Sequence, residues 1–342
     1  MSRNFGSTNR WVNKRNFQNY MITWLGGLLG VGPALGEVFF VASSSSQYYD
    51  WLLHCGVKSD RIVDTLYEGE ALMTADQNDV LCVCPGTYTE TVETDWDKRY
   101  THIVGLGGPN IRGYDTYGTQ FYTSTVTVAR IIEVTGQRCQ FHNVTFANNG
   151  ANATCLSAMY INAYGIRLKN CQIIGMMAST QCDTAKANSL NLGPYASYLD
   201  AEDCIIGTSE WATQGSDTNA PLYFSSASGG TMPQEGRFTR CSFRTQIAAA
   251  TRPIVYAEKA GMGRDWVFDR CEFYAFASSH SVACTEAFQR ASGSPMTNDV
   301  VFKDCVGYNV TAFMTSTDSC TWASGGGAAA AKTGIAIAAT AS

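Results

Sequence analysis

Charged side chains are scarce in this 342-residue chain, since they make up 15% of it, against about 25% in an average globular domain. The 24 Lys and Arg residues are outnumbered by 29 Asp and Glu residues, so the formal net charge is −5. Without a basic excess the chain lacks the electrostatic signature of a nucleic-acid-binding protein, and no nucleic acid is expected as a partner. Apolar residues reach 45%, which excludes a disordered chain because there is ample side-chain surface to bury.

Clustered metal ligands and catalytic motifs are also lacking. The four histidines stand far apart, at His54, His102, His142 and His280. A structural metal site needs several ligands at short spacing, so neither a metal nor another cofactor is predicted. The chain has no Gly-x-Ser-x-Gly, Walker or dinucleotide-binding motif, which would mark a nucleophile or a phosphate cradle. No catalytic residue is therefore assigned.

Disulfide pairing is not indicated, although the chain has 13 cysteines. The number is odd, and Cys82 and Cys84 are the only close pair. Small secreted disulfide scaffolds are shorter and usually carry an even number. We therefore expect buried, reduced thiols that act as small apolar side chains.

Long apolar runs are missing too, because the stretch 21–31 is too short and too rich in glycine to span a bilayer,. It follows a basic region that is long and contains many Asn and Gln residues. A signal peptide is one interpretation. We favour an extended docking arm over residues 1–36, and the contact residues proposed for it are Trp24, Leu25, Leu28 and Leu29.

What the chain does have is an internal repeat. Six segments share the pattern apolar, polar, Asn/Asp/Arg, Cys, any, apolar, and they begin at Phe141, Leu168, Ala201, Phe238, Phe268 and Phe302. Their fourth positions are Val144, Cys171, Cys204, Cys241, Cys271 and Cys305. Successive segments are 27, 33, 37, 30 and 34 residues apart. A period in this range is typical of a stacked array of supersecondary units.

The spacing within each segment predicts two short strands joined by a bend. Positions 4 and 6 alternate as in a strand, whereas the step from position 1 to position 4 breaks the alternation by one residue. A left-handed residue at position 3 would restore it, and Asn and Asp adopt that conformation most easily. Four bends fit this requirement, at Asn143, Asn170, Asp203 and Asp304. Arg240 and Arg270 depart from it, at a cost of roughly 1–2 kcal/mol each.

A coil of about 32 residues that stacks on its neighbours is a single-stranded parallel β-helix. Successive strands would lie about 4.8 Å apart. The residues at position 4 would then form one ladder inside the tube, and those at position 1 a parallel apolar ladder. Burial of each Phe or Leu contributes about 1.5–3 kcal/mol, so these ladders would dominate stability.

A resemblance supports this architecture. The segment 79–90, Asp-Val-Leu-Cys-Val-Cys-Pro-Gly-Thr-Tyr-Thr-Glu, resembles the opening coil of right-handed parallel β-helix proteins of the pectate-lyase-like superfamily. Residues 60–75 are similar to the short amphipathic helix that caps this coil, and residues 101–109 look like the next coil. The resemblance covers about residues 37–307 and implies an all-β, right-handed fold. It implies no single activity, because this fold hosts lyases, hydrolases, adhesins and viral spikes.

The catalytic marks of the superfamily are missing. There is no Gly-His-Gly of polygalacturonases and no complete Arg-x-Pro-x-x-Arg of pectate lyases. Asp200, Glu202 and Asp203 form the densest acidic cluster, but Asp203 already has a role at a bend. Tyrosines and tryptophans outside the ladders could stack on sugars or form protein interfaces, and they include Tyr48, Tyr122, Tyr195 and Tyr198.

We therefore expect a docking arm over residues 1–36, a β-helix domain over 37–320 and an Ala/Gly-rich docking tail over 321–342. The profile resembles bacteriophage structural proteins. The function expected first is a non-enzymatic virion component, on the capsid rather than the tail, assembled in the host cytoplasm. Its partners would be other virion proteins, further copies of this chain in a trimer, or a host surface polysaccharide. The alternatives are a polysaccharide lyase or hydrolase and a carbohydrate-binding adhesin.

Overall fold

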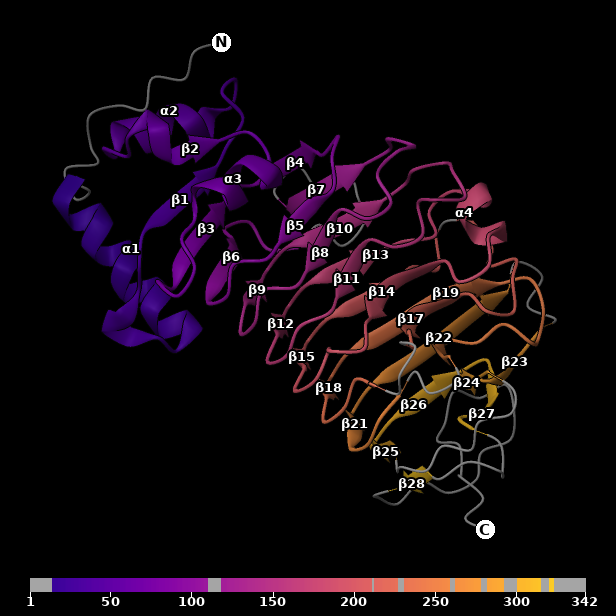
Figure 1. Ribbon diagram of the computed structural model, residues 1–342. Helices are drawn as coiled ribbons and strands as arrows, with labels where there is room; N and C mark the ends of the chain where they lie inside the picture. The colour runs from indigo at the N-terminus through magenta and orange to yellow at the C-terminus, as the bar shows by residue number, and fades with distance from the viewer. Residues whose placement is uncertain are drawn as a thin grey trace.

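The computed structural model describes residues 14–109, 118–210, 212–226, 231–258, 262–277, 282–291, 300–314 and 320–322. These residues form an elongated tube of parallel strands that begins beside helix α1 and ends at strand β28 (Figure 1). Three long sheets run along the tube, and we call them A, B and C. The C-terminal tail proposed for residues 321–342 lies outside the described residues apart from Thr321 and Trp322.

Sheet A has eleven strands in the order β2-β1-β3-β6-β9-β12-β15-β18-β21-β25-β28. Their bounds are β2 Ile62–Val63, β1 Val38–Val41, β3 Asp79–Val83, β6 Thr101–Gly105, β9 Gln140–His142, β12 Arg167–Lys169, β15 Asp200–Glu202, β18 Arg237–Thr239, β21 Trp266–Asp269, β25 Val300–Lys303 and β28 Cys320–Trp322.

Sheet B has eight strands, β4 Gly86–Thr89, β7 Thr119–Thr123, β10 Thr145–Asn148, β13 Gln172–Ile174, β16 Ile205–Gly207, β19 Ser242–Ile247, β22 Glu272–Ala277 and β26 Val306–Tyr308. Sheet C has seven, β5 Thr94–Trp96, β8 Ile132–Val134, β11 Met159–Ile161, β14 Asn188–Leu192, β17 Ala220–Phe224, β20 Val255–Ala257 and β24 Phe288–Arg290. A small sheet pairs β23 Cys284–Glu286 with β27 Val310–Ala312.

Between β3 and β24 the chain visits sheets A, B and C in turn, so each of these coils supplies one strand to each sheet. Thus β9 leads to β10 and β11, and the next coil begins with β12, which pairs in parallel with β9. This is the predicted parallel β-helix. Coil length varies because extra residues enter the turns, whereas the strands keep their register.

Apolar ladders fill the tube. In sheet A, Phe141, Leu168 and Ala201 lie opposite one another on consecutive strands, and each is fully buried. Farther along, Phe238 stacks on Phe268 with their ring centroids 5.2 Å apart and an interplanar angle of 10°. Stacked rings of this kind add roughly 0.5–1.5 kcal/mol per pair to the free energy of burial.

The position-4 side chains lie inside the tube, and all six are buried. Each cysteine thiol among them donates to a backbone carbonyl, as Cys171 Sγ does to Phe141 O at 3.2 Å. All cysteines with described side chains are free thiols. The six bend residues have φ between 50° and 56°, and these are Asn143, Asn170, Asp203, Arg240, Arg270 and Asp304.

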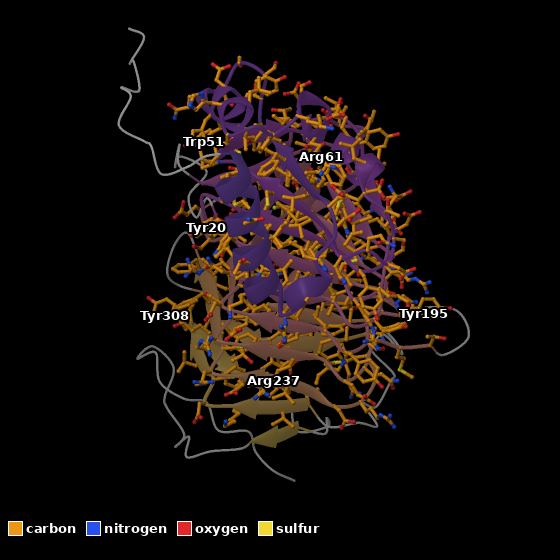
Figure 2. The ribbon with its side chains drawn as sticks, turned by 90° about the vertical axis from the view of Figure 1, so that its left-hand side faces the viewer. Tyr20, Trp51, Arg61, Tyr195, Arg237 and Tyr308 are labelled. Carbon is orange, nitrogen blue, oxygen red and sulfur yellow. The ribbon has the colours of Figure 1, made fainter. Side chains whose placement is uncertain are left out.

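Residues 14–36 are not an extended arm, as the sequence led us to expect. Helix α1, Lys14–Leu29, lies across the outer face of sheet A at its N-terminal end (Figures 1 and 2). A spacing of four residues places buried side chains on one helical face, namely Phe17, Met21, Leu25 and Leu29. They pack on outward side chains of β1, β3 and β6. Gly30 ends the helix with φ of 70°, the left-handed conformation that favours glycine.

The four proposed docking residues differ in how far they are exposed. Leu25 and Leu29 are 0% and 2% exposed and belong to the chain's own core, so they are not free to contact a partner. Leu28 is half-buried against the same cluster. Trp24 is 36% exposed, and docking through it stays a prediction.

The capping helix is shorter than the expected 60–75. A 3-10 turn, η2 (Ser59–Arg61), precedes β2, and helix α3 spans only Leu66–Leu72. Ile62 and Val63 are β-branched and pair in parallel with Phe40 and Val41 instead of entering the helix,. The remaining helices are η1 Gly32–Ala34, α2 Gln47–His54 and α4 Ser179–Asp183. None of the helices in the described ranges has the length and apolar character needed to span a bilayer.

Candidate functional site

The outer face of sheet A is apolar under α1 and polar beyond it. Strand register places one outward side chain per coil in a row, His102, Gln140, Arg167, Asp200 and Arg237. A second row runs beside it, His142, Lys169, Glu202, Thr239, Asp269 and Lys303. Oppositely charged groups are neighbours in both rows, as Arg167 and Asp200 are in the first and Lys169 and Glu202 in the second.

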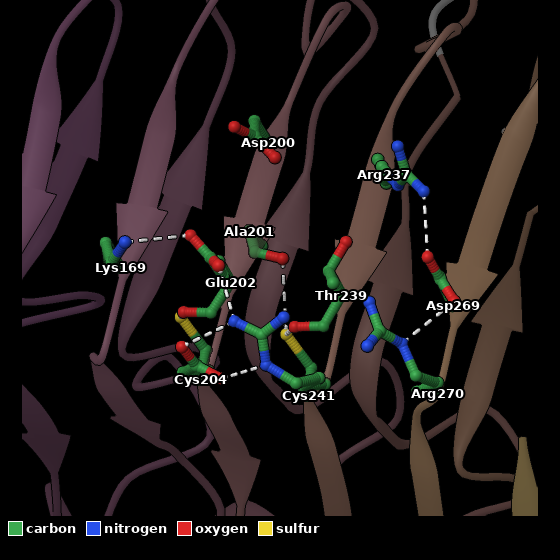
Figure 3. Close-up of polar contacts among 12 residues, drawn as sticks. Lys169, Asp200, Ala201, Glu202, Cys204, Arg237, Thr239, Cys241, Asp269 and Arg270 are labelled. Carbon is green, nitrogen blue, oxygen red and sulfur yellow. Dashed lines mark hydrogen bonds and ion pairs between the residues drawn. The ribbon is translucent and has the colours of Figure 1, made fainter.

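The carboxylates of these two rows are ion-paired, and Figure 3 shows the ion pairs of Glu202 and Asp269. Asp200 lies 3.1 Å from Arg167 Nε, and Glu202 lies 3.0 Å from Lys169 Nζ. Asp269 is 2.8 Å from Arg237 Nη2. The acidic cluster named from the sequence is thus engaged with cations of neighbouring coils.

These partners keep the carboxylates ionised. Hydrogen bonds from Lys169 and Arg240 lower the pKa of Glu202. Burial by itself would raise the pKa of Asp269, but its hydrogen bond with Arg237 and the nearby positive charge of Lys303 outweigh burial and lower it. Neither group is therefore held in the protonated form that a general acid needs.

A groove of about 590 Å³ lies over the first residues of strands β6, β9, β12 and β15, on the outer face of sheet A. Its floor includes His102, Gln140 and Arg167. One wall is the C-terminal end of α1 with η1, over residues 29–34. A second wall consists of the turns that lead from sheet C into sheet A, and its residues are Tyr100, Arg138, Tyr164, Gly165 and Tyr198.

A left-handed residue repeats in these turns. Each stands three positions before an inward ladder residue of sheet A, and the six have φ between 54° and 72°: Tyr100, Arg138, Gly165, Tyr198, Glu235 and Asp265. The backbone amides of the first five donate to carbonyls of the next coil, as Arg138 N does to Tyr164 O at 3.1 Å. This set of residues, the turn ladder, therefore places the side chains of Tyr100, Arg138 and Tyr198 at the rim of the groove, whereas Gly165 adds none.

Arg138 lies between two tyrosine rings of this wall. Its guanidinium carbon is 5.8 Å from the centroid of Tyr100 and 5.9 Å from that of Tyr164, within the range of cation–π attraction. The described residues offer it no ion pair. At Gly165 a Cβ atom would come within 3.1 Å of Arg138 Cγ, so glycine leaves room for the arginine.

Two histidines lie on neighbouring strands beside the groove, although the sequence suggested that they stand alone. Burial, helped by the neighbouring His142, lowers the pKa of His102 to about 3. Burial lowers the pKa of His142 to about 4, with a contribution from Arg167 and Lys169. His102 Nε2 faces Asn78 Oδ1 at 3.3 Å, while its buried Nδ1 has no hydrogen-bond partner.

Glu93, Asp95 and Glu133 bring three carboxylates together on sheet C. Arg130 lies between them and is 3.2 Å from Glu133, and it also forms an ion pair with Glu93. The arginine neutralises much of the negative charge that would attract a cation, so we assign no metal to this cluster.

Sequence reasoning found some of this region and missed the rest. Asp200, Glu202 and Tyr198 were candidates, and the structure places Asp200 and Tyr198 in the groove. Tyr100, Arg138 and Tyr164 were not recognised. The repeat could have indicated Arg138 alone, since it stands three positions before Phe141. Tyr100 precedes the first segment of the repeat, and Tyr164 stands four positions before Leu168.

No protein-family model matches the chain, and no curated protein matches it. Among solved structures it is similar to pectin methylesterase PemA from Erwinia chrysanthemi, with a TM-score of 0.51 and 12% identity over 82% of this chain and 81% of that chain. The deglycosylated pectin methylesterase from Aspergillus niger gives 0.45 and 14% identity over 84% and 83%. This likeness shows the fold alone, and it confirms the predicted right-handed parallel β-helix.

Proposed function

We propose that the chain is a glycan-binding β-helix whose groove holds an acidic sugar chain. The observation that carries this is Arg138, a cation held between the rings of Tyr100 and Tyr164. Aromatic rings present flat apolar faces with a polar edge, which suits the faces of sugar rings. A guanidinium group binds carboxylates with strong, charge-assisted hydrogen bonds.

The spacing of the coils along this wall suits the binding of a sugar polymer. Consecutive coils are about 4.8 Å apart, which is close to the length of one sugar ring in an extended chain. Tyr100, Tyr164 and Tyr198 come from three of the turns along this wall. A glycan laid along the tube would therefore meet polar or aromatic groups at almost every ring.

Binding is favoured over hydrolysis. Glycoside hydrolysis ordinarily uses two carboxyl groups, one of which is protonated. On the strands of sheet A from β12 to β25, the outward carboxylates are Asp200, Glu202 and Asp269, and each is ion-paired with arginine or lysine. The similar structure PemA is described as a pectin methylesterase, which is a further reason to test a sugar chain derived from pectin.

The test is calorimetric titration of the full chain with tetragalacturonate, a uronic acid oligomer, and with neutral maltotetraose. We expect binding of tetragalacturonate only. Arg138→Gln should weaken it about tenfold or more, because a lost charge-assisted hydrogen bond costs about 1.5–3 kcal/mol. Arg244→Gln is the matched control, since Arg244 lies over Tyr274 on sheet B at 5.7 Å, outside the groove. Equal loss in both variants, or equal binding of both sugars, would contradict the proposal.

A role in a bacteriophage particle is the second candidate, and an exposed apolar patch favours it. Tyr20 is 67% exposed, Trp24 36% and Trp51 45%, and Tyr20 and Trp51 lie on the same side of the N-terminal end (Figure 2). Such a patch suits a contact with another protein. Tyr20→Ser with Trp24→Ser should abolish co-sedimentation with phage particles if the patch is the attachment point. Retained co-sedimentation would contradict attachment through this patch.

A further inference from the structure

Helix α1 and the η1 turn occupy the outer face of sheet A at one end of the groove. Beneath them the face is apolar, with Val80, Cys82 and Val104 packed against the helix. Leu29, Gly30, Val31 and Ala34 then form the end wall of the groove. The polar rows begin where this cover stops, and Arg237 lies beyond it in the view of Figure 2.

Hydrogen bonds fix this end wall in place. Gln140 Nε2 donates to Leu29 O at 3.0 Å, and Asn78 Nδ2 donates to Ala34 O at 3.0 Å. Gly36 N donates in turn to Asn78 O at 3.1 Å. Together with the buried Leu25 and Leu29 side chains, these contacts make the wall part of the folded core rather than a movable cover.

The opposite end of the groove is open within the described residues. Past Tyr198 and Asp200 the outer face continues with Arg237 and Lys303, whose side chains are 53% and 46% exposed. The described helices that lie on sheet A are at its N-terminal end (Figure 1). A polymer can therefore extend along the tube in this direction only.

From this asymmetry we infer that the groove takes the end of an acidic glycan chain and not an internal segment. The inference rests on the proposed glycan-binding function. A chain laid along the tube past Tyr198 and Tyr164 meets the backbone of residues 29–34 and cannot pass it. The terminal ring would lie over Gln140 and His102, next to this wall.

His102 lies at the floor of this end of the groove. It is 1% exposed, and its Nε2 faces Asn78 Oδ1 at 3.3 Å. The imidazole is therefore packed as part of the floor on which the terminal ring would rest.

The experiment uses the full chain and two polygalacturonate fractions that differ only in mean length. The number of protein copies bound per chain is measured at saturation by light scattering. End binding predicts the same number of copies on long and short chains, so halving the mean length doubles the capacity per gram. Internal binding predicts copies in proportion to length and an unchanged capacity per gram.

The outcomes separate the two proposals. If tetragalacturonate binds but the copies per chain rise with length, chain-end recognition is overturned and the glycan-binding function stands. If neither fraction binds, both proposals fail. Deletion of residues 1–36 is a poorer test, because it would expose Val80 and Val104 and the shortened chain could misfold. The length comparison needs no variant.

Discussion

The guanidinium carbon of Arg138 lies 5.8 Å from the ring centroid of Tyr100, although 38 positions separate the two residues in the sequence. Each has a positive φ and stands three residues before an inward ladder residue. The register of sheet A therefore brings them together, and the same register places Tyr164 on the other side of the arginine. The stacking of coils, rather than any local motif, builds the wall of the groove.

This relationship predicts how the wall responds to changes at Tyr164. Tyr164→Phe keeps the ring over Arg138, and tetragalacturonate affinity should change little. Tyr164→Leu removes the ring, and the loss of about 0.5–1 kcal/mol per exposed cation–π contact should weaken binding roughly two- to fivefold. Calorimetric titration of both variants with tetragalacturonate checks this order of affinities. If Phe weakens binding as much as Leu does, the ring is not what matters.

His142 predicts a dependence of stability on pH. Its pKa falls from 6.5 to about 4 in the folded chain, through burial and then through Arg167 and Lys169. As pH drops below 6.5 the unfolded chain takes up the proton first, so the folded state loses up to about 1.4 kcal/mol per pH unit until pH 4. His102, with its pKa of about 3, extends this loss to lower pH.

Urea unfolding of wild type and His142→Gln at pH 7 and pH 4.5 measures this effect. The variant cannot titrate, so its free energy of unfolding should fall less between the two pH values. His54→Gln is the control, because His54 is exposed at the end of α2. An unchanged pH dependence in His142→Gln would show that this imidazole is not the group responsible.

From the buried Glu90 we expect a pH dependence of stability that is opposite in sign to that of His142. The residue is fully buried, its Oε1 accepts from Leu66 N at 2.9 Å, and burial raises its pKa from 4.5 to about 7. The folded chain thus holds the proton more tightly, and stability contributed by this group falls as pH rises from 4.5 to 7.

Glu90→Gln keeps an acceptor for Leu66 N without a charge. It should therefore unfold at higher urea concentration than wild type at pH 8 and at a similar concentration near pH 5. Glu210→Gln, a change at an exposed glutamate elsewhere on the tube, should show no such gain. A variant less stable than wild type at pH 8 would mean that the carboxylate is needed in its ionised form.

The repeat made the fold predictable because its signal recurs six times and has a direct geometric meaning. The one-residue bend at position 3 follows from the broken alternation between Phe141 and Val144, and the structure gives Asn143 a φ of 56°. The groove could not be predicted from the repeat in the same way. Its residues lie in turns of variable length, so that Tyr100 and Arg138 become neighbours only once the coil register is known.

The prediction of an extended N-terminal arm was wrong for a different reason. The glycines at 26 and 27 and the polar residues before them suggested an extended arm. The spacing of Phe17, Met21 and Leu25 was the stronger signal, since apolar residues four apart indicate an amphipathic helix. The apolar outer face of β3, with Val80, supplies the surface that stabilises this helix, and the sequence alone did not reveal that face.

Asn170 offers a direct test of the bend geometry. Its φ is 50°, and its Nδ2 donates to Asn143 Oδ1 at 2.9 Å. Asn170→Gly loses the hydrogen bond but adopts a positive φ freely, whereas Asn170→Ala also has to adopt a left-handed conformation that costs an L-residue roughly 1–2 kcal/mol. The larger unfolded-state entropy of glycine opposes this cost by roughly 0.5–1 kcal/mol. The alanine variant should therefore be less stable than the glycine variant by up to about 1.5 kcal/mol, as measured by urea unfolding. An alanine variant more stable than the glycine variant would contradict the left-handed bend at this position.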